Sequence, residues 1–172
     1  METRPTLFGD GVIVRPGRPA DASALTTILA EETVSRWWGI PESAQRLADK
    51  LLGDDEVVLL VIEVEGQVAG AIEYSEENDP EYRHAGIDVY LGSAFQGRGL
   101  GTEAVRLVTR FLFDGRQHHR LTIDPAAHNE RAIRCYEKVG FKPVGVMREY
   151  ELGPDGHFHD GLLMDMLRMD LL

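Results

Sequence analysis

A glycine-rich stretch, Gln-Gly-Arg-Gly-Leu-Gly-Thr at residues 96–102, joins two segments of contrasting pattern. An apolar, strand-like run at 87–91 precedes it, and a helical pattern opens at Thr102 and continues to Phe113. Because glycines lack a Cβ, several backbone N–H groups can approach one anion, and a helix start adds unpaired N–H donors and a positive dipole end. The stretch therefore predicts a strand–loop–helix unit that binds a phosphate or pyrophosphate.

Two better-known glycine loops also bind phosphates, but their spacing differs from this one. Gly97, Gly99 and Gly101 do not give the G-x-G-x-x-G order of a dinucleotide-binding loop, and no Gly-Lys-Ser/Thr follows as in a P-loop. A turn that uses its glycines without binding a ligand is the structural alternative, because a glycine loop alone is weak evidence.

Hydrophobic periodicity predicts the other elements. Strands are expected at 12–15, 57–64, 67–74, 84–91, 120–124, 142–152 and 157–169, and helices at 20–31, 42–52 (entered through Pro41), 102–113 and 129–138, with an acidic loop at 75–81. This order predicts an α/β protein with a mixed central β-sheet and helices on both faces. The unit at 84–124 requires a parallel strand pair, and ligands collect beyond the carboxyl ends of such strands.

Length and composition limit the class of protein. A chain of 172 residues that is 43% hydrophobic is expected to form one domain, spanning residues 1–172. Its longest apolar runs reach only strand length, so no membrane span is expected, and the N-terminal residues lack the pattern of a signal peptide. With a single cysteine no internal disulfide can form, which is compatible with a cytoplasmic location.

The acidic balance also restricts the partners. A net charge of −11 argues against a nucleic-acid partner, since phosphate backbones require basic patches. Between Asp54 and Leu91 there are eleven acidic residues and one basic residue, Arg83. A field of that sign attracts polycations, although a solubilising acidic surface is the plain alternative.

A second segment, N-E-R-A-I-R-C-Y-E-K-V-G-F, begins at Asn129, twenty-eight residues beyond Gly101. Together with Gln96, Gly99 and Gly101, which match the pattern Q/R-x-x-G-x-G/A, this segment resembles the acetyl-CoA-binding core of the GNAT N-acetyltransferase superfamily. The resemblance implies the GNAT fold, in which the parallel strand pair forms the acetyl-CoA cleft. It also implies acetyl-CoA as co-substrate and no metal.

The same resemblance assigns the donor site. The residues expected to bind acetyl-CoA are Leu91, Gln96, Gly97, Arg98, Gly99, Leu100, Gly101, Thr102 and Asn129. Backbone amides of the loop would hold the pyrophosphate, whereas Leu91 and Asn129 would contact the pantetheine arm. Tyr136 would protonate the departing thiolate, a step that suits a phenol beside a thiol of pKa about 8.5. A half-buried core tyrosine is the alternative, and Cys135 is interpreted as a small buried hydrophobe.

Carboxylates on the expected strands indicate a cationic acceptor. An attacking amine is protonated at neutral pH, so a base must remove a proton and anions must hold the cation. Asp88 shares one strand face with Tyr90, and Asp124 ends the next strand, although aspartate is depleted in strands. Glu73 is a third candidate, on a more peripheral strand. The alternatives are a solvent-facing position for Asp88 and a strand-end cap before Pro125 for Asp124.

Aromatic and histidine pairs complete the candidate residues. Trp37 and Trp38 are expected to supply an aromatic wall, with one of the two lining the pocket because adjacent side chains cannot both point inward. His157 and His159 share one strand face, but no further ligands are evident. A histidine pair on the substrate side or on the surface is therefore expected, rather than a metal site.

From residue 35 to residue 141 the sequence is also similar to aminoglycoside 6′-N-acetyltransferases. The similarity is carried by Arg36-Trp37-Trp38-Gly39, Asp79-Pro80, Gly86-Ile87-Asp88, Gly99-Leu100-Gly101-Thr102, Asp124-Pro125 and the run R-A-I-R-C-Y-E-K at 131–138. It implies that Asp88 and Asp124 contact the aminoglycoside, with Asp88 as candidate base. Asp88 and Tyr136 are then the catalytic residues, and Trp37, Trp38, Glu73, Asp88 and Asp124 bind the acceptor. The expected activity acetylates an aminoglycoside 6′-amine and confers antibiotic resistance.

Two other functions remain open at this point. The segment 153–165 resembles broader GNAT members that modify protein N-termini or other small amines, so a protein N-terminal or polyamine acetyltransferase is the alternative. A non-catalytic acyl-CoA-binding protein is a third candidate of a different class. A monomer or a homodimer is the family expectation.

Overall fold

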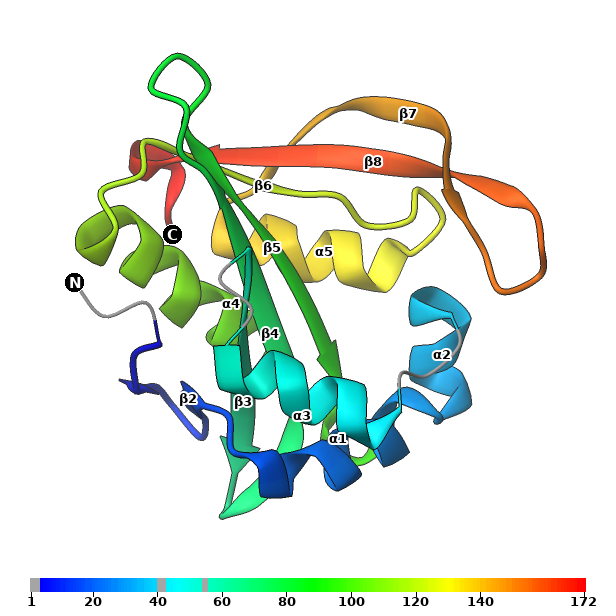
Figure 1. Ribbon diagram of the computed structural model, residues 1–172. Coiled ribbons are helices and arrows are strands. Elements are labelled where there is room, and N and C mark those ends of the chain that lie inside the picture. The colour runs from blue at the N-terminus through cyan, green and yellow to red at the C-terminus, as the bar shows by residue number, and fades with distance from the viewer. Residues whose placement is uncertain (1–3, 40–42, 54–55) are drawn as a thin grey trace.

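The computed structural model describes residues 4–39, 43–53 and 56–172. Its strands are β1 (Leu7–Phe8), β2 (Ile13–Pro16), β3 (Val57–Val64), β4 (Gln67–Glu77), β5 (His84–Leu91), β6 (Arg120–Ile123), β7 (Lys142–Leu152) and β8 (Phe158–Leu167). Its α-helices are α1 (Ala22–Leu29), α2 (Glu32–Trp38), α3 (Ala44–Gly53), α4 (Leu100–Arg110) and α5 (Glu130–Val139). Within the described ranges, the strands form one eight-stranded sheet in the order β1-β2-β3-β4-β5-β6-β8-β7 (Figure 1).

The predicted mixed sheet is confirmed, because β5 and β6 run parallel while the other neighbouring strands run antiparallel. Two apolar clusters lie on opposite faces of this sheet. Ile87 of β5 packs in the cluster that includes side chains of α4 and α5, whereas Tyr90 packs in the cluster that includes α1 and α3. Successive side chains of β5 therefore point to opposite faces of the sheet and pack in two separate cores, and helices cover both faces.

Three local predictions were wrong or incomplete. The acidic loop at 75–81 begins later than expected, because β4 continues to Glu77 and the Glu76 carboxylate receives hydrogen bonds from Arg116 at 2.8 Å and His118 at 2.7 Å. The helix expected at 20–31 is present as α1, but a second helix, α2, follows it and was not predicted. Glu31 separates the two, because it has an extended backbone and accepts a hydrogen bond from the Ser93 N–H at 2.6 Å. Helix α4 starts two residues before the expected position and passes into a π-helical turn at Phe111–Gly115. The expected helix entry at Pro41 lies outside the described residues.

The parallel pair is short, and this shapes the molecule. β5 and β6 pair at Ala85 with Leu121 and at Gly86 with Thr122. Beyond Gly86, β5 stays paired with β4 as far as Leu91, while β6 ends at Ile123. The two neighbouring strands therefore diverge toward their carboxyl ends, and the sheet opens there.

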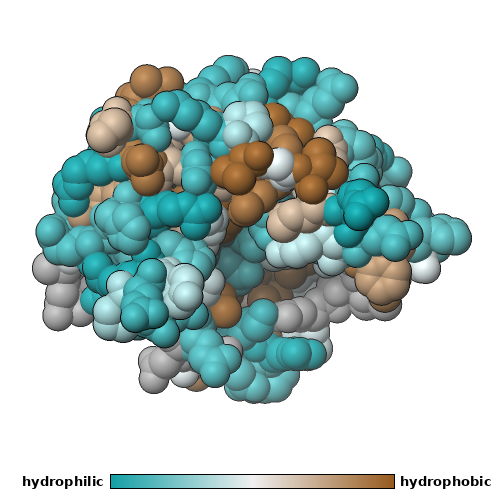
Figure 2. Space-filling model, turned by 90° about the horizontal axis from the view of Figure 1, so that it is seen from above, coloured by the Kyte–Doolittle hydropathy of each residue, from teal (hydrophilic) through white to brown (hydrophobic). Residues whose placement is uncertain are grey.

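The last two strands form a hairpin that reaches beyond the body of the sheet. In Figure 1 the hairpin of β7 and β8 extends past the beginning of α5, on the same side of the molecule as α2. Figure 2 looks down on the β7–β8 side, where apolar side chains gather; Val144 and Val146 of β7 are 55% and 59% exposed. No helix within the described residues is long and apolar enough to span a membrane.

Candidate active site

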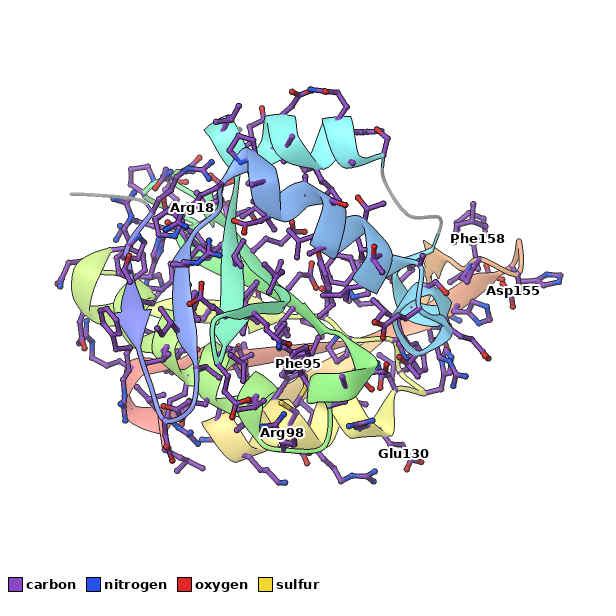
Figure 3. All side chains as sticks on the ribbon, turned by 90° about the horizontal axis from the view of Figure 1, so that it is seen from below. Arg18, Phe95, Arg98, Glu130, Asp155 and Phe158 are labelled. Atoms are coloured by element: carbon purple, nitrogen blue, oxygen red, sulfur yellow. The ribbon has the colours of Figure 1, made fainter. Side chains whose placement is uncertain are left out.

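A cleft of about 750 Å³ opens where β5 and β6 diverge. Residues of α2, the end of β5, the glycine loop, the start of α4, the segment after β6, α5 and β7 line it. Most of the predicted site residues line this cleft: Trp37, Trp38, Asp88, Leu91, Gln96, Gly97, Gly99, Leu100, Gly101, Thr102, Asp124, Asn129 and Tyr136. Arg98 and Glu73 are not among the lining residues. Arg98 is exposed on the glycine loop (Figure 3), and Glu73 pairs with Asp88 in the β4–β5 ladder.

The glycine loop has the geometry of an anion site. Gly97 and Gly99 adopt φ of 75° and 77°, a left-handed conformation that L side chains rarely adopt. Gly99 is the N-cap of α4, and the first helical hydrogen bond runs from the Glu103 N–H to its carbonyl at 3.1 Å. The N–H groups of residues 100–102 therefore precede the hydrogen-bonded ladder of the helix. These donors fit a pyrophosphate.

The Gln96 side chain fixes this loop in place. Its Nε2 donates to the Leu91 carbonyl at 2.8 Å, and its Oε1 accepts from Arg131 at 3.2 Å. The amide thus joins the end of β5 to the loop and to α5. Gly101 matters for the same packing, because a Cβ there would lie 3.2 Å from Leu91 Cδ1.

Helix α5 borders the cleft with a capped start and a cationic face. The Asn129 Oδ1 accepts from the Ala132 N–H at 3.2 Å, which makes Asn129 the N-cap, and Glu130 follows at the exposed beginning of the helix (Figure 3). Three cations of this helix also line the cleft: Arg131, Arg134 and Lys138. Together with the glycine loop they give one end of the cleft an anion-binding character in an otherwise acidic chain.

Asp88 lies at the opposite end, on β5. The residue is exposed and lines the cleft, although neighbouring protein atoms displace part of the water around its carboxylate. This desolvation, and then the charges of Asp124, Glu73 and Glu151, raise the pKa of Asp88 to about 7. A carboxylate that titrates near neutral pH can accept a proton from a reacting group and release it again.

Two residues of β7 join this acidic end, and sequence reasoning missed both. The Tyr150 hydroxyl donates to Asp124 Oδ2 at 2.5 Å, and this hydrogen bond raises the pKa of Tyr150 to about 12. Glu151 lines the cleft, where desolvation and then the charge of Asp124 raise its pKa. No local pattern marks them, because their position depends on the register of the last hairpin.

Tyr136 is buried on α5, and its side chain lines the cleft. Burial, followed by the nearby Cys135, Asp88 and Asp124, raises the pKa of its phenol, so the hydroxyl keeps its proton at neutral pH. Burial also raises the pKa of the Cys135 thiol, whose sulfur lies 3.1 Å from Thr102 Oγ1. A thiol held in its neutral form is a poor nucleophile, which agrees with the interpretation of Cys135 as a packing residue.

The two tryptophans of α2 have different neighbours, yet both line the cleft, so the expectation that only one of them would do so was wrong. Trp38 packs edge-on against Tyr90 with ring centroids 4.8 Å apart, whereas Trp37 contacts His128 at 5.0 Å. His128 lines the cleft and lies 5.5 Å from His159. His157 and His159 are not among the residues that line the cleft, and their location on the substrate side or on the surface stays a prediction. Within the described ranges, no group of three His, Cys, Asp or Glu side chains could hold a metal ion.

An anion site of backbone amides, a carboxylate that titrates near neutral pH and a protonated phenol thus share one cleft. Acid and base groups beside a site for a phosphorylated donor define a group-transfer enzyme. The chain belongs to the acetyltransferase (GNAT) domain family, whose profile matches residues 12–142. It is an N-acetyltransferase, as predicted, and acetyl-CoA is the acetyl donor of this family.

Two relatives of known activity agree with the assignment as an N-acetyltransferase. The chain is 32% identical over 170 residues to the aminoglycoside N(6′)-acetyltransferase type 1 of Klebsiella pneumoniae, a match that covers 88% of this chain and 82% of that protein. It is 30% identical over 119 residues to the spermidine N(1)-acetyltransferase of Escherichia coli strain K12, covering 69% of this chain and 62% of that protein.

Solved structures share the fold. AAC(6′)-Ib in complex with paromomycin and acetyl-CoA superposes with a TM-score of 0.75 at 27% identity, covering 94% of this chain and 96% of that chain. Mycobacterium smegmatis RimJ in complex with CoA-disulfide superposes with a TM-score of 0.85 at 24% identity, covering 99% and 89% of the two chains. The RimJ likeness shows the common GNAT fold.

Proposed function

We propose that this N-acetyltransferase acetylates a primary amine of a cationic small molecule, and that the acceptor is an aminoglycoside, modified at its 6′-amine. The observation that carries the proposal is the acidic end of the cleft, where Asp88, Asp124 and Glu151 line the wall. Desolvation and then the charges of the neighbouring carboxylates raise the pKa of Asp88, so negative charges gather at this end of the cleft. A multiply charged ammonium compound offsets these charges on binding.

The donor occupies the other end of the cleft in this proposal. The amides of residues 97–102 hold the pyrophosphate of acetyl-CoA, with the cations of α5 beside them. Two glycines with positive φ and the uncovered start of α4 fit this group. When bound, acetyl-CoA supplies an acetyl group activated as a thioester.

The residues between the two ends handle the protons. The Asp88 carboxylate accepts a proton from the acceptor's ammonium, which leaves a neutral amine able to attack. The Tyr136 hydroxyl, kept protonated by burial, donates a proton to the leaving sulfur. Asp124 and Glu151 hold the acceptor's remaining charges, Glu73 contributes its negative charge from beside Asp88 without lining the cleft, and Trp37 and Trp38 border the acceptor.

An acceptor panel tests the proposal with the purified chain. Thiol release from acetyl-CoA is measured with kanamycin, spermidine and an alanine-ended peptide at matched concentrations. Kanamycin is expected to give the highest kcat/KM, and mass spectrometry should place one acetyl group on its 6′-amine. Turnover of the peptide without turnover of kanamycin would contradict the aminoglycoside assignment.

A polyamine acceptor is the second candidate, because one relative is a spermidine N(1)-acetyltransferase and the same carboxylates suit a polyamine. A higher kcat/KM with spermidine than with kanamycin would favour it. Thermal stabilisation by CoA with no amine consumed would indicate instead a protein that only binds acyl-CoA.

A further inference from the structure

Tyr150 reaches from the outermost strand of the sheet to a carboxylate of the cleft. Strand β7, which carries Tyr150, is separated from β6 by β8, yet the Tyr150 hydroxyl donates to Asp124 Oδ2 at 2.5 Å, just beyond the end of β6. Tyr150 is 49% exposed, so burial of its ring alone does not account for this position.

The absence of a side chain at Gly161 leaves room for the ring of Tyr150. A Cβ added at Gly161 would lie 2.7 Å from Tyr150 Cδ1, a distance that real Cβ atoms do not show. Gly161 also bridges to Ala126, and the Leu162 N–H donates to the Pro125 carbonyl at 2.8 Å. Gly161, on which the Tyr150 ring packs, is thus fixed to the residues that directly follow Asp124.

An irregularity in β7 turns the side chain of Tyr150 toward Gly161. The β7–β8 register pairs Met147 with Gly161 and then Glu151 with His159, so β7 has extra residues between these pairs. Glu149 in this bulge adopts φ of 48°, a conformation that is unfavourable for residues other than glycine. Bulges redirect side chains, and strained backbone is retained where the surrounding structure holds it.

We propose that Tyr150 is a positioning residue that fixes the Asp124 carboxylate for the acceptor's second positive charge, while Asp88 serves as the base. With Oδ2 held by the phenol, Asp124 can offer Oδ1 to an ammonium group. The bulge in β7, the packing of the ring on Gly161 and the hydrogen bond then together hold Asp124 in place at the acceptor end of the cleft. The inference rests on the proposed function, since it places Asp124 on the acceptor side.

Two consequences separate positioning from a merely structural role. A loosely held Asp124 binds the acceptor less well, so the acceptor KM rises while the acetyl-CoA KM is unchanged. The charge of Asp124 is also one of those that raise the pKa of Asp88, together with Glu73 of β4 and Glu151 of β7. Loss of the phenol changes how that charge is placed and offset, so it should shift the apparent pKa of the kcat/KM profile.

The test is a double-mutant cycle of Tyr150→Phe and Asp124→Asn in the full chain. Tyr150→Phe keeps the ring on Gly161 and removes only the hydroxyl, and it is expected to raise the acceptor KM about tenfold. In the Asp124→Asn background the same change should have no further effect. Tyr82→Phe, at a tyrosine that is 69% exposed, is the matched control and should behave as the wild type.

The outcomes also separate this inference from the proposed function. The cycle is run with whichever amine of the panel the wild type acetylates, so a failure of kanamycin as acceptor contradicts the proposed function alone. A Tyr150→Phe variant with unchanged acceptor KM and pH profile, or an effect that adds fully to that of Asp124→Asn, overturns the positioning role.

Discussion

Replacing Asp88 by asparagine tests the proposed base directly. Because the pKa of Asp88 lies near 7, raising the pH through neutrality converts its carboxyl group to the ionised form that acts as the base. Asparagine keeps the shape of the side chain but cannot accept the proton. General-base catalysis contributes about 10²- to 10⁴-fold, so kcat/KM for the amine should fall at least about 100-fold at pH 7.5.

The pH profile gives the same prediction a second, independent measurement. Because the ionised form is active, the wild-type kcat/KM should rise with pH, bend near pH 7 and level off above it. Thiol release between pH 5.5 and pH 8.5 measures the profile, and titration calorimetry checks that acetyl-CoA still binds to the Asp88→Asn variant. Glu81→Gln removes the same charge at an exposed turn and should leave both measurements unchanged. The reasoning is refuted if Asp88→Asn keeps more than a tenth of the wild-type kcat/KM, or if the wild-type profile is flat across pH 7.

Three further outcomes follow from the structure. The pKa of Asp88 is higher in the folded protein than in the unfolded chain, so between about pH 4 and pH 7 the unfolded chain ionises first and the wild-type protein loses stability as the pH rises. Asparagine does not ionise, so the melting temperature of Asp88→Asn should exceed that of the wild type by an amount that grows up to pH 7. Tyr136→Phe should lower kcat about 100-fold with little change in the acetyl-CoA KM, and an unchanged kcat would exclude the phenol as the acid. Gly99→Ala forces alanine into φ of 77° where its Cβ meets no atom, so it should lose about 1–2 kcal/mol of stability and bind acetyl-CoA more weakly, whereas Gly53→Ala should do neither.

Local pattern was enough to predict much of this fold. The apolar runs of β3 and β5, the glycine loop and the Gly140 cap of α5 are encoded by neighbouring residues, and each lies where periodicity places it. The parallel pair followed from the strand–helix–strand order alone. The residues predicted for the donor half, apart from Arg98, line the cleft, while their contacts with acetyl-CoA stay a prediction.

The errors share a physical cause, which is contact between distant segments. Glu76 stays in β4 because Arg116 and His118 bind it, and Glu31 interrupts a helical pattern beside Ser93. Glu151 reaches the cleft only through the register of β7 and β8. Propensity carries no information about such partners. The single domain, the cytoplasmic location and the choice between monomer and homodimer stay predictions.

The shortness of the β5–β6 ladder has a consequence for the order in which the enzyme is built during translation. Strand β6 shares two residue pairs with β5, and its other edge is filled by β8, which follows α5 and β7 in the sequence. A nascent chain that has emerged only as far as α5 therefore lacks one full neighbour for β6 and one wall of the cleft. We expect the nascent enzyme to gain its acceptor site only once β7 and β8 have been made, after its donor loop has already formed.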